Sequence, residues 1–178
     1  MAEAPLVASS FDTPFGTLTV LATPEDGVVR SSGFRPMRDT VAALPSRLQA
    51  RGLVEGDVPG VAAAIDAWLA GDGDAITRIP AAQDGGPFFQ ELWAQLRTVP
   101  SGSSVSYQEL AAMAGRPRAM RAAGTACARN NIAPFVPCHR VVKSGGALGS
   151  YGFGGEGMKA AMLALEGERT VDDARVTR

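Results

Sequence analysis

The pattern of apolar and polar residues predicts strands in the first part of the chain. Residues 11–20 have the pattern of a strand with a turn at Gly16, and residues 17–22 alternate well enough to be half buried. Residues 28–34 have the composition of a partner strand. Because residues 24–27 form the strong turn signal Pro-Glu-Asp-Gly, the two runs are expected to pair as an antiparallel hairpin.

Two segments with apolar residues at helical spacing follow the predicted hairpin. Residues 39–52 carry apolar side chains on one helical face, although Pro45 leaves the start of this helix open. Residues 61–69 carry a second such face. The loop at residues 81–87 contains two glycines and a proline, so the boundary between two domains is placed near residue 85.

Three helices are predicted in the second half. Residues 88–99 have apolar side chains at three- and four-residue spacing and stop at a Val-Pro-Ser-Gly sequence. Ser106 and Glu109 have the spacing of a capping box at the start of a second, short helix. After a turn at residues 115–117, residues 118–128 form the third helix and complete a helix-turn-helix candidate.

This third helix consists mostly of alanine, glycine and other small residues. Such a surface can pack closely on another helix or enter a groove too narrow for bulky side chains, and composition alone favours packing. Four arginines around the helix shift the interpretation toward a phosphate-facing surface. They are Arg116, Arg118, Arg121 and Arg129.

Composition fits a globular protein of one domain or two small ones, since 178 residues with 46% hydrophobic content can bury a core. The mean hydropathy of +0.04 and the lack of a long apolar run predict no transmembrane helix and no membrane partner. The N-terminus carries an acid and no basic region, so no secretion signal is expected and the protein is interpreted as cytoplasmic.

The net charge of −1 conceals a difference between the halves. Residues 1–85 hold eleven acidic and six basic residues, whereas residues 86–169 hold five acidic and nine basic residues. A basic second half indicates a surface that faces an anion such as nucleic acid, with ordinary scatter of surface charge as the alternative.

The only histidine of the chain directly follows Cys138, inside the apolar run of residues 135–142. A core cysteine in a strand is the simpler interpretation of a bare Cys-His pair. Pro137 removes a backbone donor before the cysteine and implies a turn or strand edge, where side chains can face a cleft. Cys138 is therefore a candidate nucleophile as well as a candidate core residue.

His139 could serve Cys138 only indirectly, because adjacent side chains on an extended chain point to opposite sides. A water or a local turn would have to link them, and a carboxylate from elsewhere would have to orient the imidazole. One histidine and two cysteines without CxxC spacing predict neither a metal site nor a disulfide scaffold. The second cysteine, Cys127, is interpreted as a core residue because of its helical spacing from Ala123.

Together, these motifs make the stretch from Phe89 to Gly167 resemble the O6-alkylguanine-DNA alkyltransferases, also called methylated-DNA–protein-cysteine methyltransferases. The resemblance rests on Phe89-Gln90, Trp93, Leu96, Pro100, Gly102, Ser106-Tyr107, Arg121-Ala122-Ala123-Gly124, Asn130, Pro137-Cys138-His139-Arg140-Val141-Val142, Gly149-Ser150-Tyr151-Gly152 and Leu163-Ala164-Leu165-Glu166-Gly167. The first half, with its hairpin, is similar to the family's variable first domain.

The resemblance implies an α/β (α+β) fold of two domains. Residues 1–85 would form a small antiparallel sheet domain with helices, similar to ribonuclease H. Residues 86–170 would form a helical domain like a winged helix-turn-helix, which carries the active site. Residues 171–178 would be a tail.

The family repairs DNA by direct reversal of damage. By this resemblance, the protein binds duplex DNA, flips O6-alkylguanine or O4-alkylthymine out of the stack, and moves the alkyl group irreversibly to Cys138 in a single turnover. It is expected to act on double-stranded DNA as a monomer without cofactor or metal, and cooperative binding along the duplex stays open.

The resemblance also assigns chemistry to the residues around Cys138. Glu166, His139 and a bridging water would form the relay that makes Cys138 a thiolate, which supplies the carboxylate that the Cys-His pair lacked. Tyr107 would donate to the guanine ring and promote flipping. Lys159 would lie near the same network, with a solvent-exposed helix charge as its alternative.

Arg121 matches the finger that replaces the flipped base in the duplex, with a phosphate contact as its alternative. The minor groove would receive the rest of that helix surface, namely Arg118, Ala119, Ala122 and Gly124. The base pocket would be lined by Val141, Tyr151 and Gly152. Asn130 would tie the helix to the turn that carries Cys138.

The chain departs from the family pattern at three places, the first of which is Gly152, at a position that is often serine. Asn131 stands where a proline is usual, and Phe153 is an insertion in the glycine-rich loop. Three other functions stay as alternatives: a lesion-binding protein without transfer, a DNA-binding regulator, and a Cys-His hydrolase that turns over an acyl substrate. Cys138 argues against the first of these, since such proteins carry another residue at that position.

Overall fold

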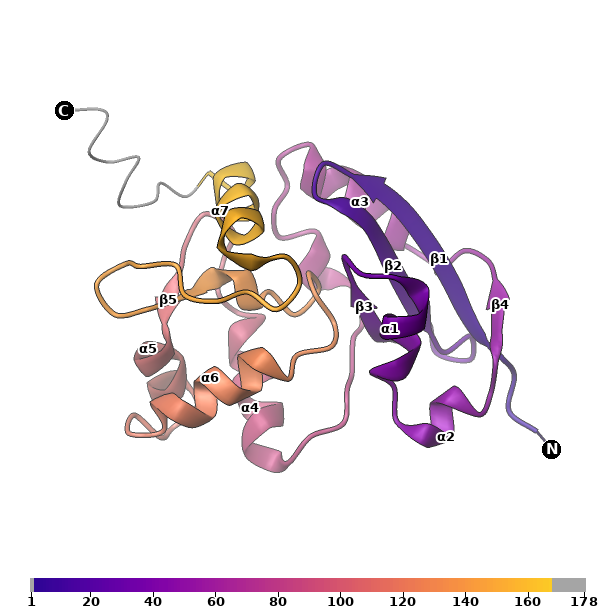
Figure 1. Cartoon of the computed structure of the whole chain (residues 1–178), viewed down its shortest axis with the longest axis horizontal. Coiled ribbons are helices and arrows are strands. Elements are labelled where there is room, and N and C mark those ends of the chain that lie inside the picture. The colour runs from indigo at the N-terminus through magenta and orange to yellow at the C-terminus, as the bar shows by residue number, and fades with distance from the viewer. Residues whose placement is uncertain (1, 168–178) are drawn as a thin grey trace.

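The computed structural model describes residues 2–167 and has a four-stranded sheet at one end of the molecule (Figure 1). Strands β1 (Leu6–Thr13), β2 (Gly16–Ala22) and β3 (Val29–Gly33) are antiparallel and lie in the order β3-β2-β1. Strand β4 (Leu53–Glu55) extends the sheet at β1, to which it is parallel. The predicted hairpin is confirmed as the β2–β3 pair.

Two strands differ from the predicted pattern. Residues 11–20 are not one strand, because the chain turns at Pro14 and Phe15, where the amide of Phe15 donates to Thr13 Oγ1 at 3.1 Å. The sequence does not predict β4, because all three of its side chains are exposed and show no alternation. The sheet is therefore antiparallel with one parallel edge strand.

Helices cover both faces of the sheet. Leu18 and Val20 of β2 pack in the same core as α3 (Val61–Leu69), whose Trp68 is fully buried. On the opposite face, Leu6 and Leu21 pack with the segment that holds α1 (Met37–Ala42) and α2 (Ser46–Gln49) through its buried leucines, Leu44 and Leu48. The predicted helix at residues 61–69 is confirmed.

The predicted helix at residues 39–52 is wrong as a single element. The structure has α1 and α2 in its place, and Pro45 lies directly before α2. Proline has no amide hydrogen and its ring clashes with the preceding turn, so it begins the second helix and does not continue the first.

The second half contains the three predicted helices, α4 (Pro87–Leu96), α5 (Tyr107–Met113) and α6 (Met120–Ala128). The predicted capping box is confirmed at the start of α5. The amide of Glu109 donates to Ser106 Oγ at 3.0 Å, and the amide of Ser106 donates to Glu109 Oε2 at 3.4 Å. Helix α6 begins later than predicted, because the residue before Met120 has non-helical backbone angles of φ −91° and ψ 37°.

Short elements complete the second half. Strands β5 (Val105–Ser106) and β6 (Val141–Val142) form a small parallel sheet, and α7 (Gly155–Leu165) follows. There are also two 3-10 turns, η1 (Ile76–Arg78) in the first half and η2 (Cys138–Arg140) directly before β6. The predicted tail at residues 171–178 lies outside the described residues.

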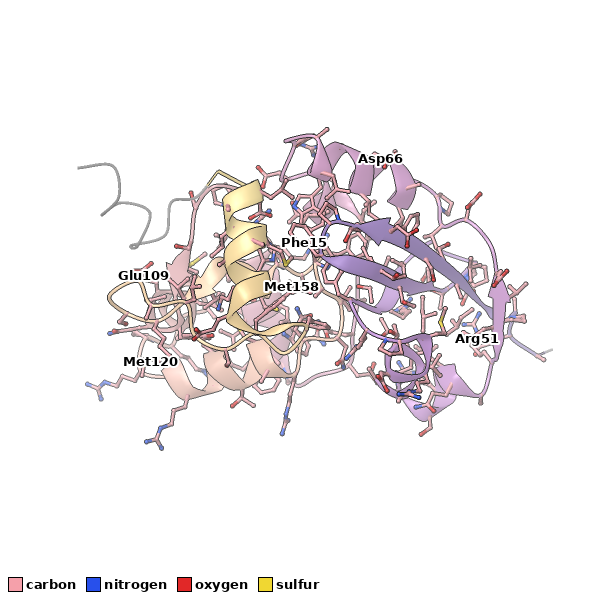
Figure 2. The ribbon with its side chains drawn as sticks, turned by 45° about the horizontal axis from the view of Figure 1, so that its top comes forward. Phe15, Arg51, Asp66, Glu109, Met120 and Met158 are labelled. Atoms are coloured by element: carbon pink, nitrogen blue, oxygen red, sulfur yellow. The ribbon has the colours of Figure 1, made fainter. Side chains whose placement is uncertain are left out.

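The two halves share one hydrophobic core, to which β2, α3, α4, α6 and α7 all contribute buried residues. Ser32 of β3 donates from its amide to the carbonyl of Asn131 at 2.8 Å and from Oγ to the carbonyl of Ala133 at 2.7 Å. Figure 2 shows Phe15 at the β1–β2 turn and Met158 on α7 near the centre of the molecule, where the halves meet. Because packing is continuous, the domain boundary near residue 85 stays a prediction.

Candidate active site

Cys138 begins the 3-10 turn η2, which leads directly into β6. Pro137 precedes this turn, so the alternative that places Cys138 within a strand is wrong. The cysteine is 5% exposed, and its Sγ accepts a hydrogen bond from Asn130 Nδ2 at 3.2 Å. Asn130 follows α6 and also donates to the carbonyl of Val136 at 2.8 Å, so it connects that helix to the turn before Cys138.

Burial and two nearby groups shift the pKa of the Cys138 thiol in opposite directions. Burial raises its pKa, whereas the hydrogen bond from Asn130 and the positive charge of Lys159 lower it, and burial prevails. The resting side chain is therefore a neutral thiol, and it needs a base to become a nucleophilic thiolate.

Lys159 of α7 is completely buried, so the alternative of a solvent-exposed helix charge is wrong. Its Nζ has no hydrogen-bond partner among residues 2–167 and lies 5.9 Å from the centre of the Tyr107 ring. Burial lowers the pKa of Lys159, and the thiols of Cys138 and Cys127 oppose this effect. An ammonium held at this position favours negative charge on the Cys138 sulfur.

His139 and Glu166 form a completely buried pair, with His139 Nε2 2.9 Å from Glu166 Oε1. Burial alone would raise the pKa of Glu166, but the charges and hydrogen bonds of His139 and Arg140 lower it to about 2. Arg140 is always charged, so the carboxylate stays ionised even when His139 is neutral. Burial lowers the pKa of His139 despite the opposing carboxylate, which favours a neutral ring that can accept a proton.

Arg140 is a central residue of the site to which the sequence assigns no role. Its buried guanidinium donates to Glu166 Oε2 at 3.0 Å and Oε1 at 2.8 Å, and to the carbonyls of Val99 and Gly73 at 2.8 Å each. Trp68 of α3 adds a donor from the first half, since its Nε1 lies 3.1 Å from Glu166 Oε1. The sequence indicates a role for Arg140 through its position after Cys138 and His139 in the motif. No local pattern indicates that Trp68 belongs to the site.

A small cavity of about 70 Å³ opens beside Cys138. Its walls come from α5, α6, η2 and the loop before α7, through Tyr107, Gly124, Cys127, Ala128, Cys138, Ser150, Tyr151 and Gly152. Tyr107, Tyr151 and Gly152 thus gather around the thiol, whereas Val141 is buried in β6 and does not line the cavity. Cys127, interpreted as a core residue, is half-buried and packs against the main core, and it also lines this cavity.

The arginines around α6 fall into two groups. Arg116 and Arg129 lie over the rings of Phe88 and Phe89 of α4, at 4.7 and 5.8 Å from the ring centres. The other two, Arg118 and Arg121, are exposed and free of such stacking. Figure 2 shows Met120 at this end of the molecule, where side chains ending in nitrogen extend away from the ribbon. Ala122 and Gly124 on α6, and Ala119 directly before it, are partly exposed.

Residues 2–167 contain neither a helix that could span a membrane nor a cluster of metal-binding side chains. No helix there is long and apolar enough to cross a bilayer. No three or more side chains of histidine, cysteine, aspartate or glutamate in this part of the chain converge as ligands for a metal ion.

The family model described as the DNA binding domain of 6-O-methylguanine DNA methyltransferase matches residues 87–168. The chain is also 38% identical over 175 residues to a methylated-DNA–protein-cysteine methyltransferase of Mus musculus, covering 89% of this chain and 80% of the relative. The constitutive methylated-DNA–protein-cysteine methyltransferase of Bacillus subtilis is 34% identical over 162 residues, which are 87% of this chain and 92% of the relative.

Solved structures show the same similarity over nearly the full length. The O6-methylguanine methyltransferase of Mycobacterium tuberculosis has a TM-score of 0.72 at 30% identity, covering 97% of this chain and 99% of that chain. The crystal structure of Mycobacterium tuberculosis OGT in complex with DNA has a TM-score of 0.71 at the same identity and coverage. The mixed α/β fold class is therefore confirmed.

Proposed function

The chain belongs to the methylated-DNA–protein-cysteine methyltransferase family, enzymes of DNA repair by alkyl transfer, and we propose that Cys138 accepts the alkyl group of O6-alkylguanine in duplex DNA. One observation carries this proposal. The Cys138 thiol lines a small cavity, and the next residue in the chain, His139, is buried and hydrogen-bonded to Glu166. A nucleophile, a base and a carboxylate that orients the base are thus present together.

The proton of the thiol leaves through His139 in this proposal. His139 Nε2 carries a hydrogen that it donates to Glu166, which leaves Nδ1 as the basic nitrogen. Nδ1 is buried and has no hydrogen-bond partner among residues 2–167. One water between Nδ1 and Sγ would take the thiol proton and pass it to the ring, and the resulting imidazolium would be stabilised by the Glu166 carboxylate.

Transfer then exchanges one bond for another. The thiolate forms a bond to the alkyl carbon, the bond between that carbon and guanine O6 breaks, and its electron pair stays on the guanine. Burial raises the pKa of Tyr107 to about 12, so its hydroxyl keeps its proton and can donate a hydrogen bond to the departing base. The thioether has no route back to a thiol, so each molecule acts once. Lys159 stabilises the thiolate before transfer. The same cavity would also accept O4-alkylthymine.

DNA binding is assigned to α6 and its exposed arginines, with the small residues Ala119, Ala122 and Gly124 resting in the minor groove. The similar Mycobacterium tuberculosis protein is known in complex with DNA. Extruding a base costs a few kcal/mol, and Arg121 would offset part of this cost by filling the space that the base leaves. Tyr151 and Gly152 would hold the extruded base, with Val141 behind them, and Asn130 would keep α6 in register with Cys138.

The intact mass of the protein tests the proposed transfer. After incubation with excess duplex that carries O6-methylguanine, the mass should rise by one methyl group per molecule and then stop. Peptide mapping should place the methyl group on Cys138. Undamaged duplex is the control. Release of demethylated DNA in excess of protein would contradict single use, and tight lesion binding without mass change would favour a non-catalytic role.

An Arg121→Ala variant should repair duplex roughly ten- to a hundredfold more slowly, because extrusion costs a few kcal/mol and each 1.4 kcal/mol is a factor of ten. Repair of the same lesion in single-stranded DNA should change little, since no pair must be broken. Arg118→Ala removes the same charge and is the control. Equal losses on both substrates in both variants would show that Arg121 contributes only phosphate contacts.

A further inference from the structure

We propose that Gln83 is a positioning residue for the nucleophile and acts through Asn130. Gln83 belongs to the segment that joins the two halves, more than forty positions before the residues it contacts. The inference rests on the proposed function to the extent that Cys138 is the reacting residue. Its test, however, follows the thiol itself and needs no DNA.

Both ends of the Gln83 side chain are engaged. Its Nε2 donates to Asn130 Oδ1 at 2.9 Å, and its Oε1 accepts from the main-chain amide of Asn131 at 2.8 Å. A main-chain amide can only donate, so the Asn131 amide fixes which end of the Gln83 amide faces it. The donor end of Gln83 is thereby directed at Asn130.

Asn130 is in turn held in one orientation. Its Oδ1 accepts from Gln83 and from the amide of Ile132 at 3.0 Å, while its Nδ2 donates to the carbonyl of Val136 and to Cys138 Sγ. The residue is 2% exposed, so solvent does not compete for these contacts. Two donors on one side and two acceptors on the other leave a single favourable orientation of the amide.

The orientation matters for the sulfur because only Nδ2 can stabilise a thiolate. A donor beside Sγ favours the negative charge, whereas a rotated amide would place Oδ1 against it and oppose ionisation. With Gln83 absent, the Ile132 amide and the carbonyl of Val136 would still hold Asn130 in this orientation. Gln83 therefore adds to the preference for the orientation in which Cys138 can ionise.

A Gln83→Glu variant separates this role from simple packing. Glutamate has nearly the size of glutamine and keeps an acceptor for the Asn131 amide, but it presents a second oxygen to Asn130 Oδ1. Either Asn130 tolerates two facing acceptors, or it rotates and turns Oδ1 toward Cys138. Both outcomes weaken donation to the sulfur. Gln83→Ala removes both contacts and leaves a space, yet it adds no repulsion.

The thiol titration of Cys138 is the measurement. Thiolate absorbance is recorded against pH for each protein, with the same protein carrying Cys138→Ala as the blank. The midpoint should rise by about one pH unit in Gln83→Glu, which lowers the rate of alkyl transfer near neutral pH about tenfold. Gln83→Ala should lose about threefold in rate, although its melting temperature falls further. If Gln83 contributed only packing, Gln83→Ala would show the larger change in transfer rate, in the thiol titration and in melting temperature.

Gln90→Ala is the matched control. Gln90 Nε2 donates to the carbonyls of Gln83 and Gly85 at 2.7 and 3.3 Å, so its loss loosens the same segment without touching Asn130. Its thiol titration should equal that of the wild type. A shift as large as that of Gln83→Glu would overturn the proposal, as would an unshifted Gln83→Glu. If the wild type accepts no alkyl group while Gln83→Glu still shifts the titration, the proposed function fails and the positioning role stands.

Discussion

A Cys138→Ala variant is expected to transfer no alkyl group while it still binds alkylated duplex. The substitution removes the thiol that directly precedes His139 in η2, and it leaves this turn intact because alanine suits a helical turn. Asn130 keeps its bond to the carbonyl of Val136, so its Nδ2 is not left without an acceptor. Mass spectrometry should show no added alkyl group, and a gel-shift assay should show binding within a factor of about two to three.

Cys127→Ala is the matched control for this result. Cys127 lines the same cavity, but burial raises the pKa of its thiol and no histidine is hydrogen-bonded near it among the described residues. The variant should therefore transfer one alkyl group per molecule, as the wild type does. Alkylation of Cys127 in the Cys138→Ala protein would contradict the assignment of the nucleophile, because it would show that the cavity and not the relay activates a thiol.

Arg140→Met is expected to lower the free energy of unfolding by about 3–5 kcal/mol, the usual cost of removing one partner of a buried ion pair. Methionine fills much of the same space but donates to neither Glu166 nor the carbonyls of Val99 and Gly73. Glu166 would stay buried with His139 and Trp68 as its remaining donors. Chemical denaturation at neutral pH measures the loss, and alkyl transfer should fall with the disordered relay.

The pH dependence of this loss identifies its cause. In the wild type, the pKa of Glu166 is lowered from 4.5 to about 2, so its ionised form stabilises the fold above about pH 4.5 and this contribution disappears as the pH falls toward 2. Without Arg140, burial raises the pKa of Glu166, and the carboxyl group can become neutral at a higher pH. The stability difference between wild type and variant should therefore narrow as the pH falls from the raised pKa of the variant carboxyl group, above 4.5, toward 2.

Arg97→Met provides the comparison. Arg97 is also partly buried, but it donates to the carbonyls of Thr77 and Ile79 and pairs with no carboxylate. Its loss should lower stability by an amount that does not change between neutral and acidic pH. If the stability difference from the wild type narrows equally in Arg140→Met and Arg97→Met as the pH falls, then overall destabilisation by acid, and not the Glu166 charge, explains the Arg140→Met result.

Local signals allow much of the fold to be predicted. The capping box of Ser106 and Glu109 and the apolar stripe of residues 61–69 depend on neighbours within one or two helical turns, so the sequence contains all the information. Strand β4 could not be predicted, because its stability comes from pairing with β1 and its own side chains are exposed. Propensity is a weak guide where tertiary pairing decides.

The same distinction between local signals and long-range contacts applies to the candidate site. The motif allows Cys138, His139 and Glu166 to be named, but it assigns no role to Arg140. A role for Trp68 cannot be predicted, because its bond to Glu166 joins residues 98 positions apart. The place of Cys127 at the cavity could not be predicted for a related reason. Its helical spacing from Ala123 puts both on one side of α6, but spacing alone does not show that this side ends at a cavity.

The contacts between the halves also bear on when the thiol acquires its properties. Ser32 and Ala133 are 101 positions apart, and Arg140 and Gly73 are 67 apart. Contacts of such separation require closure of long loops and form late in folding compared with those inside helices. A chain whose helices have formed but whose halves have not docked would lack the bonds of Trp68 to Glu166 and of Arg140 to Gly73. The relay proposed to activate Cys138 would therefore depend on docking of the two halves.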